Sequence, residues 1–439
     1  MRKLYYKINK INGPVIELKA KNIQFGELAK IFLSNGEQTY GQVIKIDNDF
    51  VSLQVFSGSK GISTDDKLCF LGHQARLRFH KENLKGRIFN GTGIAIDGRA
   101  KINDIEQIEI NGPLFNPINR LVPSNMIHTG IPMIDMFNTL VESQKIPIFS
   151  IAGEPYNELL ARIGLQAEVD VIIFGGMGLK YNDYLFFKKE FKENKEKIIM
   201  FVNTASDPIV ECLMVPDMCL AAAEKYAFLG DKVLVLLTDM TAFANSLKEV
   251  SIAMEQIPAN RGYPGDLYSQ LALRYERAVD IDGFGSITIL SVTTIPGEDI
   301  THPIPDNTGY ITEGQFYLKN RVIDPFISLS RLKQLVNRKT REDHALLVNV
   351  MIQLYDQCHK VRQQQSMGFN VSLFDKKLLN YGTDFESQMM NLDIKINLEN
   401  QLNLGWLLLK KHFSKDQIQM PKRIVKKYWN INVDRSDDK

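Results

Sequence analysis

The stretch IPIFSIAGEPYNELL, from Ile146 to Leu160, decides the fold of this chain. An apolar run leads into a turn of small residues, and apolar residues at helical spacing follow, which predicts a strand, a loop and a helix in succession. A Walker A segment, G-x-x-x-x-G-K-[ST], has this layout, and its loop holds phosphate groups between the strand and the helix. The order of elements therefore predicts an α/β core built around a phosphate loop.

The residues that would bind phosphate are replaced in this loop. Ser150 and Pro155 stand at the two glycine positions of the Walker A frame, and Gly153 lies between them. Tyr156 replaces the lysine that neutralises phosphate, and Asn157 replaces the Ser/Thr hydroxyl that meets magnesium. Proline has no N–H and a fixed φ, so it removes a donor where glycine would supply one. We predict a degenerate loop that holds no nucleotide tightly.

Composition limits the classes of protein to consider. The chain has 439 residues, enough for about two to four domains. Its 53 Lys+Arg and 51 Asp+Glu nearly balance, which argues against a whole-chain binder of nucleic acid. Four scattered cysteines without a C-x-x-C and seven isolated histidines predict no disulfide framework and no metal site. The start resembles no signal peptide and no apolar run reaches about 18 residues, so we expect a soluble cytoplasmic chain that meets a membrane only through partners.

Three regions follow one another, and we place them at residues 1–72, 73–325 and 326–439. Turn residues at short intervals between β-branched and aromatic residues predict a small β-barrel in the first region. The second opens with a Gly-rich link at residues 86–98, and then alternates helical segments with apolar runs that suit strands buried on both faces of a parallel sheet. These runs are Ile146–Phe149, Val171–Phe174, Ile198–Val202, Val233–Leu237 and Ile287–Val292.

The third region has helical patterns and little strand signal. Its main feature is an amphipathic stripe, which predicts packing within a C-terminal helical bundle. The charged tail, Val433–Lys439, is expected to fray. The stripe consists of Leu346, Leu347, Val350, Met351, Leu354, Tyr355 and Cys358.

A second nucleotide-site pattern lies in the segment KVLVLLTD, from Lys232 to Asp239. An apolar strand that ends in a carboxylate is the form of a Walker B strand, whose Asp holds the magnesium of a bound nucleotide. Many buried strands end in Asp, so this pattern becomes informative only together with the loop at Ser150–Asn157. We place Asp239 at the Walker B position.

Longer motifs give the chain its resemblance to a known family. Five longer motifs resemble segments of the B subunits of V-type ATP synthases, and the resemblance extends over nearly the whole chain. It is strongest to the bacterial branch of the family found in chlamydiae and spirochaetes. This implies a multidomain protein with an N-terminal β-barrel, a central RecA-like P-loop NTPase-type α/β core with a degenerate P-loop, and a C-terminal helical bundle. The motifs are QVFSGSKGIST (Gln54–Thr64), QIPANRGYPGD (Gln256–Asp266), LYSQLALRYER (Leu267–Arg277), EDITHPIPDNTGYITEGQ (Glu298–Gln315) and IDPFISLSRLKQL (Ile323–Leu335).

The resemblance implies a non-catalytic, regulatory subunit. Such chains alternate with catalytic A subunits in a ring, contact a central rotor stalk and peripheral stalk subunits, and help couple ATP synthesis or hydrolysis to proton or sodium transport. ATP or ADP with Mg²⁺ would lie at the interface with the catalytic A subunit, on the cytoplasmic face of the membrane. The catalytic relatives also carry a Glu after the second core strand. The comparable turn, Phe174–Leu179, has no carboxylate, so we expect no catalytic activity from this chain alone.

An arginine is the one catalytic group that the resemblance assigns to this chain. Family members carry it in an S-x-S-R segment just after the core, from which it reaches the nucleotide of the catalytic partner. Here the segment is Ser328-Leu329-Ser330-Arg331, so Arg331 is the candidate. Arg261 is a second candidate, although it lies in a Gly/Pro turn and is better interpreted as shaping that loop or packing against a neighbour.

Three other functions compete with this one. A self-sufficient hexameric NTPase would need an intact Walker A lysine, which Tyr156 rules against. A nucleic-acid-binding barrel would need a basic, aromatic-rich face, whereas acidic residues are interspersed in the first region. A non-catalytic subunit that holds nucleotide, similar to the F-type alpha chain, stays open as an alternative. The acidic residues are Glu17, Asp47, Asp49, Asp65 and Asp66.

Overall fold

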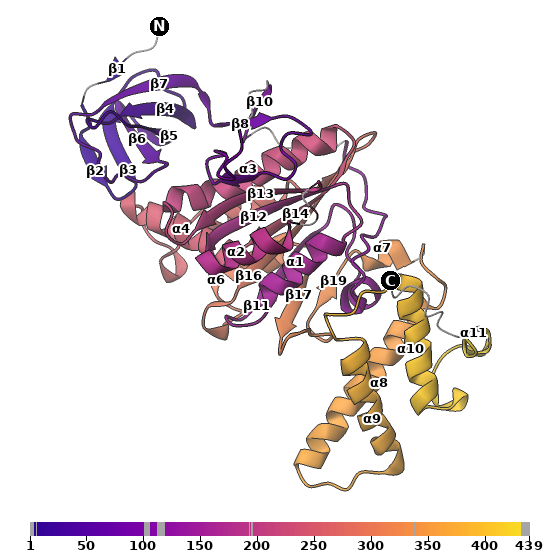
Figure 1. Ribbon diagram of the computed structural model, residues 1–439. Helices are drawn as coiled ribbons and strands as arrows, with labels where there is room; N and C mark the ends of the chain where they lie inside the picture. The colour runs from indigo at the N-terminus through magenta and orange to yellow at the C-terminus, as the bar shows by residue number, and fades with distance from the viewer. Residues whose placement is uncertain are drawn as a thin grey trace. The chain divides into compact units, whose positions relative to one another are not determined.

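The computed structural model describes residues 4–5, 7–100, 106–111, 119–192, 194, 196–337 and 339–431 (Figure 1). The charged tail at 433–439 lies outside these residues, so the predicted fraying stays a prediction. The chain forms two compact units that do not follow the chain order. The first unit comprises residues 1–122, 147–152 and 169–312, and the second comprises residues 123–146, 153–168 and 313–439. The three-region boundaries proposed from the sequence also stay predictions.

The N-terminal part of the first unit is one antiparallel sheet of seven strands, in the order β1-β7-β4-β5-β6-β3-β2 (Figure 1). Residues alternate between its two faces, and one face buries a core that includes Ile16, Ile31 and Leu53. The short strands and intervening turns are those expected from the sequence. The strands are β1 (Leu4–Tyr5), β2 (Lys10–Asn12), β3 (Val15–Lys19), β4 (Glu27–Phe32), β5 (Gln38–Asp47), β6 (Phe50–Val55) and β7 (Lys67–Gln74).

The Gly-rich segment after this sheet contains more regular structure than a link. Ile88–Asn90 forms strand β9, which pairs in parallel with β13 at the edge of the central sheet. Two further strands, β8 (Arg76–Phe79) and β10 (Glu106–Glu109), pair with each other. The prediction of a link at residues 86–98 was therefore wrong at β9, because a three-residue edge strand among glycines leaves no periodic pattern to read.

The central sheet confirms the predicted parallel α/β core. Strands β16, β14, β12, β13 and β9 are joined in parallel, and β11 lies next to β16. Each of the five apolar runs forms a strand that is buried along nearly its whole length. The short strand β15 (Val279–Asp280) pairs antiparallel with β16. The main strands are β11 (Lys145–Ser150), β12 (Val171–Leu179), β13 (Ile198–Thr204), β14 (Lys232–Thr238) and β16 (Ser286–Thr294).

The predicted turn at Phe174–Leu179 is wrong, because these residues continue strand β12. Phe174 packs against Phe187 of α2, with ring centroids 4.2 Å apart. Gly175 faces the opposite side, where an added Cβ would lie 2.8 Å from the Cys219 sulfur of α3. The glycines thus allow a helix to approach the strand closely, which is a tertiary requirement that local sequence does not reveal.

Helices cover both faces of this sheet within the first unit. Helix α2 packs on one face of β12, and α3 and α4 pack on the other, where they share one apolar core with the sheet (Figure 1). The proline at position 216 lies inside α3 without ending it. The helices are α2 (Tyr181–Glu190), α3 (Ile209–Phe228), α4 (Met240–Ala253), α5 (Leu267–Tyr275) and α6 (Pro303–Ile311).

The second unit combines α1, three short strands and the C-terminal helices. The predicted amphipathic stripe is confirmed on α8, where every stripe residue is buried except Leu346, which is half-buried. Within the described residues, no helix is long and apolar enough to cross a membrane. The elements are a π-helix (Met133–Asn138), α1 (Tyr156–Gln166), β17 (Gly314–Lys319), β18 (Val322–Ile323), β19 (Leu329–Ser330), α7 (Lys333–Asn337), α8 (His344–Ser366), α9 (Leu373–Gln388), α10 (Leu398–His412) and α11 (Lys422–Tyr428).

Candidate functional site

The phosphate loop has the predicted strand, loop and helix in order. Strand β11 ends at Ser150, which is fully buried and whose Oγ donates a hydrogen bond to the Ile151 carbonyl at 3.2 Å. Gly153 has a φ of +96°, a conformation that other residues rarely adopt. Helix α1 begins at Tyr156 after Pro155, which provides no side-chain cap. The loop geometry is therefore kept while its phosphate-binding side chains are absent.

Two carboxylates lie close in sequence to the start of α1. The Glu154 carboxylate accepts hydrogen bonds from the backbone N–H groups of Asn320 and Arg321, at 2.9 and 2.7 Å. Glu158 lies in the first turn of α1. A helix N-terminus favours nearby negative charge, and these two side chains already supply it without a lysine at position 156. The loop is thus held to the β17–β18 turn through Glu154.

Both carboxylate oxygens of the Walker B candidate, Asp239, accept hydrogen bonds within the fold. Its Oδ1 accepts hydrogen bonds from the Thr241 N–H at 2.9 Å, which caps α4, and from the Thr294 N–H at 3.1 Å. Its Oδ2 accepts from Thr294 Oγ1 at 2.5 Å. Burial raises the pKa of this carboxyl above its ordinary value, although the hydrogen bonds from Thr294 and Thr241 act in the opposite direction. Asp239 therefore joins the start of α4 to the end of β16.

The S-x-S-R segment alternates between buried and exposed residues. Ser328 and Ser330 are 9% and 1% exposed, whereas Leu329 is 44% exposed and Arg331 is also exposed. The Ser328 Oγ accepts a hydrogen bond from the Tyr317 N–H at 2.9 Å. This alternation has the period of two that extended chain requires, so the two serines hold the segment from one side and place Arg331 on the other.

Strand β19 pairs with β17 and is also held by side-chain contacts around Ser330. Its Oγ donates to the Thr139 carbonyl at 2.9 Å and accepts from Gln144 Nε2 at 3.1 Å. The Arg331 N–H donates to the Glu313 carbonyl at 2.9 Å. At Gly314, an added Cβ would lie 2.1 Å from the Leu329 carbonyl oxygen, so only glycine allows this close pairing. The backbone that carries Arg331 is therefore rigidly mounted within the second unit.

Sequence analysis missed a group of polar residues next to β19, which consists of Glu313, Lys145 and Gln144. The Glu313 carboxylate pairs with Lys145 Nζ at 2.8 Å and accepts from the Lys145 N–H at 3.0 Å. Gln144 Nε2 also donates to the Glu313 carbonyl, at 3.2 Å. Glu313 stands in one of the motifs that carried the resemblance, but nothing local to it indicates a partner 168 positions away.

Arg261 lies in its own loop with an ion-pair partner. Its guanidinium is 2.5 Å from the Asp299 carboxylate, and its carbonyl accepts a hydrogen bond from Lys248 Nζ at 2.9 Å. Hydrogen bonds from Thr301 and Arg261 lower the pKa of Asp299 to about 2. These contacts give Arg261 a part in the structure of its loop. The described residues include no group of three or more His, Cys, Asp or Glu that could hold a metal ion.

Comparison with known proteins follows the same three-part order along the chain. The family models that match are the ATP synthase alpha/beta family β-barrel domain at residues 8–72, the ATP synthase alpha/beta family nucleotide-binding domain at 130–326, and the C-terminal domain of V and A type ATP synthases at 333–429. The V-type ATP synthase beta chain of Treponema denticola is 57% identical over 434 residues, which cover 98% of this chain and 100% of the relative.

This chain belongs to the V-type ATP synthase beta chain family. Other V-type ATP synthase beta chains agree with this assignment. That of Borrelia turicatae is 57% identical over 98% of this chain and 99% of its own length. That of Protochlamydia amoebophila is 52% identical over 98% of both chains. The predicted resemblance to a bacterial branch of the family is confirmed, and so is the fold class with its barrel, nucleotide-binding α/β domain and helical C-terminal domain.

Proposed function

We propose that this chain is the non-catalytic, regulatory B subunit in the head of a rotary V-type ATP synthase. It alternates with catalytic A subunits in a ring and helps couple ATP synthesis or hydrolysis to proton or sodium transport. The names of its relatives support a place in a V-type ATP synthase. The phosphate loop supports the non-catalytic role, because Tyr156 stands at the lysine position and Glu154 is bound to the β17–β18 turn.

The observation that carries the proposal is that buried contacts hold the backbone around Arg331 while its side chain is exposed. Phosphoryl transfer spreads negative charge over equatorial oxygens, and a fixed guanidinium can meet two of them at once. Such a group must be held in place by its backbone and must project from the surface if it acts in a neighbouring subunit. The buried serines 328 and 330 and the exposed Arg331 meet both requirements. We assign Arg331 to the nucleotide of the adjacent catalytic subunit.

The remaining assignments rest on the resemblance to the family. ATP or ADP with Mg²⁺ would lie at the interface with the catalytic A subunit and would not be held tightly by the degenerate loop. The central rotor stalk and the peripheral stalk would be further partners, and the membrane would be reached only through the complex, on its cytoplasmic face. Asp239 would then support the fold at the Walker B position, because its hydrogen bonds join α4 to β16.

Reconstitution with the catalytic subunit tests the proposal. The purified chain alone, the catalytic A subunit alone and an equimolar mixture would be compared by native mass spectrometry and by phosphate release. We expect no turnover from this chain alone, and a ring of alternating subunits with ATP hydrolysis from the mixture. Hydrolysis by the isolated chain, or an active ring of catalytic subunits that excludes it, would contradict the proposal.

A further inference from the structure

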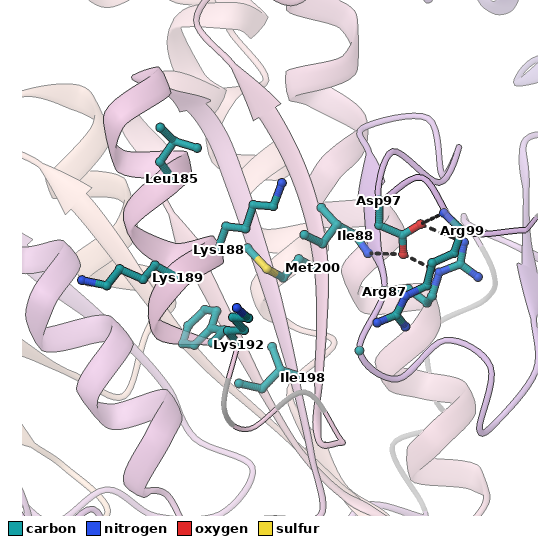
Figure 2. A pocket seen from close by; sticks show the side chains of 12 residues that line it. Arg87, Ile88, Asp97, Arg99, Leu185, Lys188, Lys189, Lys192, Ile198 and Met200 are labelled. Carbon is teal, nitrogen blue, oxygen red and sulfur yellow. Dashed lines mark hydrogen bonds and ion pairs between the residues drawn. The ribbon is translucent and has the colours of Figure 1, made fainter.

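A cavity of about 430 Å³ lies at the edge of the central sheet in the first unit (Figure 2), and its lining residues include none from the phosphate loop and none from the S-x-S-R segment. Its walls come from edge strand β9 with its flanking residues, from α2 and the chain that follows it, and from β13. Pockets that bind small molecules have volumes of roughly 300 to 1,000 Å³, so this one is large enough for an organic ligand.

The rim of the cavity is strongly basic. Five cationic side chains and one carboxylate line it. The carboxylate, Asp97, is paired with Arg87 through two hydrogen bonds at 2.5 and 3.0 Å, and both side chains are only 8% exposed. Arg87 therefore neutralises Asp97, and the exposed cations determine the charge that a ligand would meet. The cationic residues are Arg87, Arg99, Lys188, Lys189 and Lys192.

The floor of the cavity is apolar. Ile88 of β9 and Met200 of β13 are direct partners in the parallel pairing of these strands. Ile198 and Phe191 are buried beside them, and Leu185 of α2 is 41% exposed. An apolar floor under a cationic rim suits a ligand that has a flat apolar part and several negative charges, because each part then meets its complement.

The position of the lysines at a helix end explains only part of this cluster. Lys188 and Lys189 lie in the last turn of α2, where positive charge offsets the partial negative charge of a helix C-terminus. They extend in different directions in Figure 2. Lys192 follows the same helix end, whereas Arg99 comes from the segment after β9, so the cations that line the cavity belong to two separate parts of the chain. The charge of Arg99 on the opposite wall is not explained by the helix end, and together with Lys188 and Lys192 it gives the cavity cations on two of its walls.

We propose that this cavity binds a nucleotide, with its phosphate groups at the rim lysines and Arg99 and its ring on the floor formed by β9 and β13. Such a site is separate from the degenerate phosphate loop and needs no magnesium, because the protein cations neutralise the phosphates. The proposal goes beyond the subunit role described above and does not rest on it, since the isolated full-length chain would bind the ligand.

Calorimetric titration of the full-length chain tests this site, with ATP in magnesium-free buffer at about 50 mM salt. We expect a dissociation constant of about 0.1 to 1 mM, because the rim cations are exposed and partly screened. The double variant Lys188→Gln/Lys192→Gln should weaken binding about tenfold, since it removes two charges from the rim. Lys180→Gln, which removes an exposed charge from the other end of α2 and outside the cavity, should change the constant less than about twofold.

Two further titrations distinguish the cavity from the loop at α1 and from simple attraction of phosphate to surface cations. Asn157→Asp would repel phosphate from the loop at α1, so unchanged ATP binding in that variant supports the cavity. Tripolyphosphate should bind more weakly than ATP, because it lacks a ring for the floor. No ATP binding up to several times the expected constant would overturn the proposal. So would loss of binding in Asn157→Asp, an equal effect of Lys180→Gln, or tripolyphosphate binding as tightly as ATP.

Discussion

Tyr156 stands at the first position of α1, where a phosphate-binding loop carries its lysine. The change is one of several at this loop, and the structure connects them. Pro155 supplies no N–H, and Glu154 holds the loop to residues 320 and 321. Asp239 uses both carboxylate oxygens within the fold. Glu154 and Asp239 therefore have structural partners within the fold, which help to maintain the shape of the loop and of the strand end beside it.

A lysine at position 156 alone is expected not to create a nucleotide site. Tyr156→Lys restores one charge but leaves Pro155 without a donor and Glu154 beside the helix end, and grouped site residues act non-additively. Calorimetry with ATP and magnesium, together with phosphate release, should give neither tight binding nor turnover in the wild-type chain or in this variant. Tyr156→Phe serves as the matched control. Magnesium-dependent binding at about 1 μM or tighter, about −8 kcal/mol, would show that the loop is functional.

Among the secondary-structure elements, the sequence predicted the strands well and the glycine-rich segments poorly. Uninterrupted apolar runs such as Val233–Leu237 became buried strands, because few other environments accept five consecutive apolar side chains. The Gly-Gly-Met-Gly segment was predicted as a turn, yet it is strand because α3 packs closely on Gly175. In the candidate site, positions 150–157 lie where the pattern placed them. The partners of Glu154 and Glu313 are more than 160 positions away, and no local pattern encodes them.

The hydrogen bonds of Ser330 lead to a prediction about the local stability of β19. Ser330→Ala removes the hydroxyl that donates to the buried Thr139 carbonyl and accepts from Gln144 Nε2, at a cost of about 1 to 2 kcal/mol. Hydrogen exchange of the Arg331 N–H, measured by mass spectrometry, should accelerate about 5- to 30-fold if local opening follows this cost. The control Leu329→Ala changes an exposed side chain and should leave exchange nearly unchanged. Equal protection in both variants would mean that Ser330 does not hold the strand.

Across the molecule, the N-terminal sheet has its own core and also contacts the rest of the first unit. Lys10 pairs with Glu255 at 2.5 Å, and Asn12 Nδ2 donates to the Ala253 carbonyl at 2.7 Å, both at the end of α4. None of the candidate site residues lies in this sheet. We infer that residues 1–72 contribute to assembly of the ring and take no part in its chemistry.

Deletion of residues 1–72 should therefore abolish assembly with the catalytic subunit. Native mass spectrometry would show free subunits where the full chain gives a ring, and circular dichroism of the truncated chain would establish that the α/β and helical parts still fold. The double variant Lys10→Ala/Asn12→Ala, which removes only the two contacts to α4, should still assemble. A truncated chain that forms a stable and active ring would show that the barrel is not needed for assembly.

Turnover of the reconstituted head with Arg331→Ala is the decisive measurement for the role assigned to this arginine. A positioned arginine from another subunit contributes roughly 10³ to 10⁵ in rate, or about 4 to 7 kcal/mol at the barrier. The alanine variant should assemble normally, and Arg331→Lys should recover little activity because an ammonium lacks the planar fork. Arg321→Ala, in the turn between β17 and β18 and also exposed, is the matched control and should keep its activity. We predict that Arg331→Ala lowers ATP hydrolysis by the assembled head at least about 100-fold with nucleotide binding largely unchanged; an assembled head that keeps more than about half of its turnover would contradict this role.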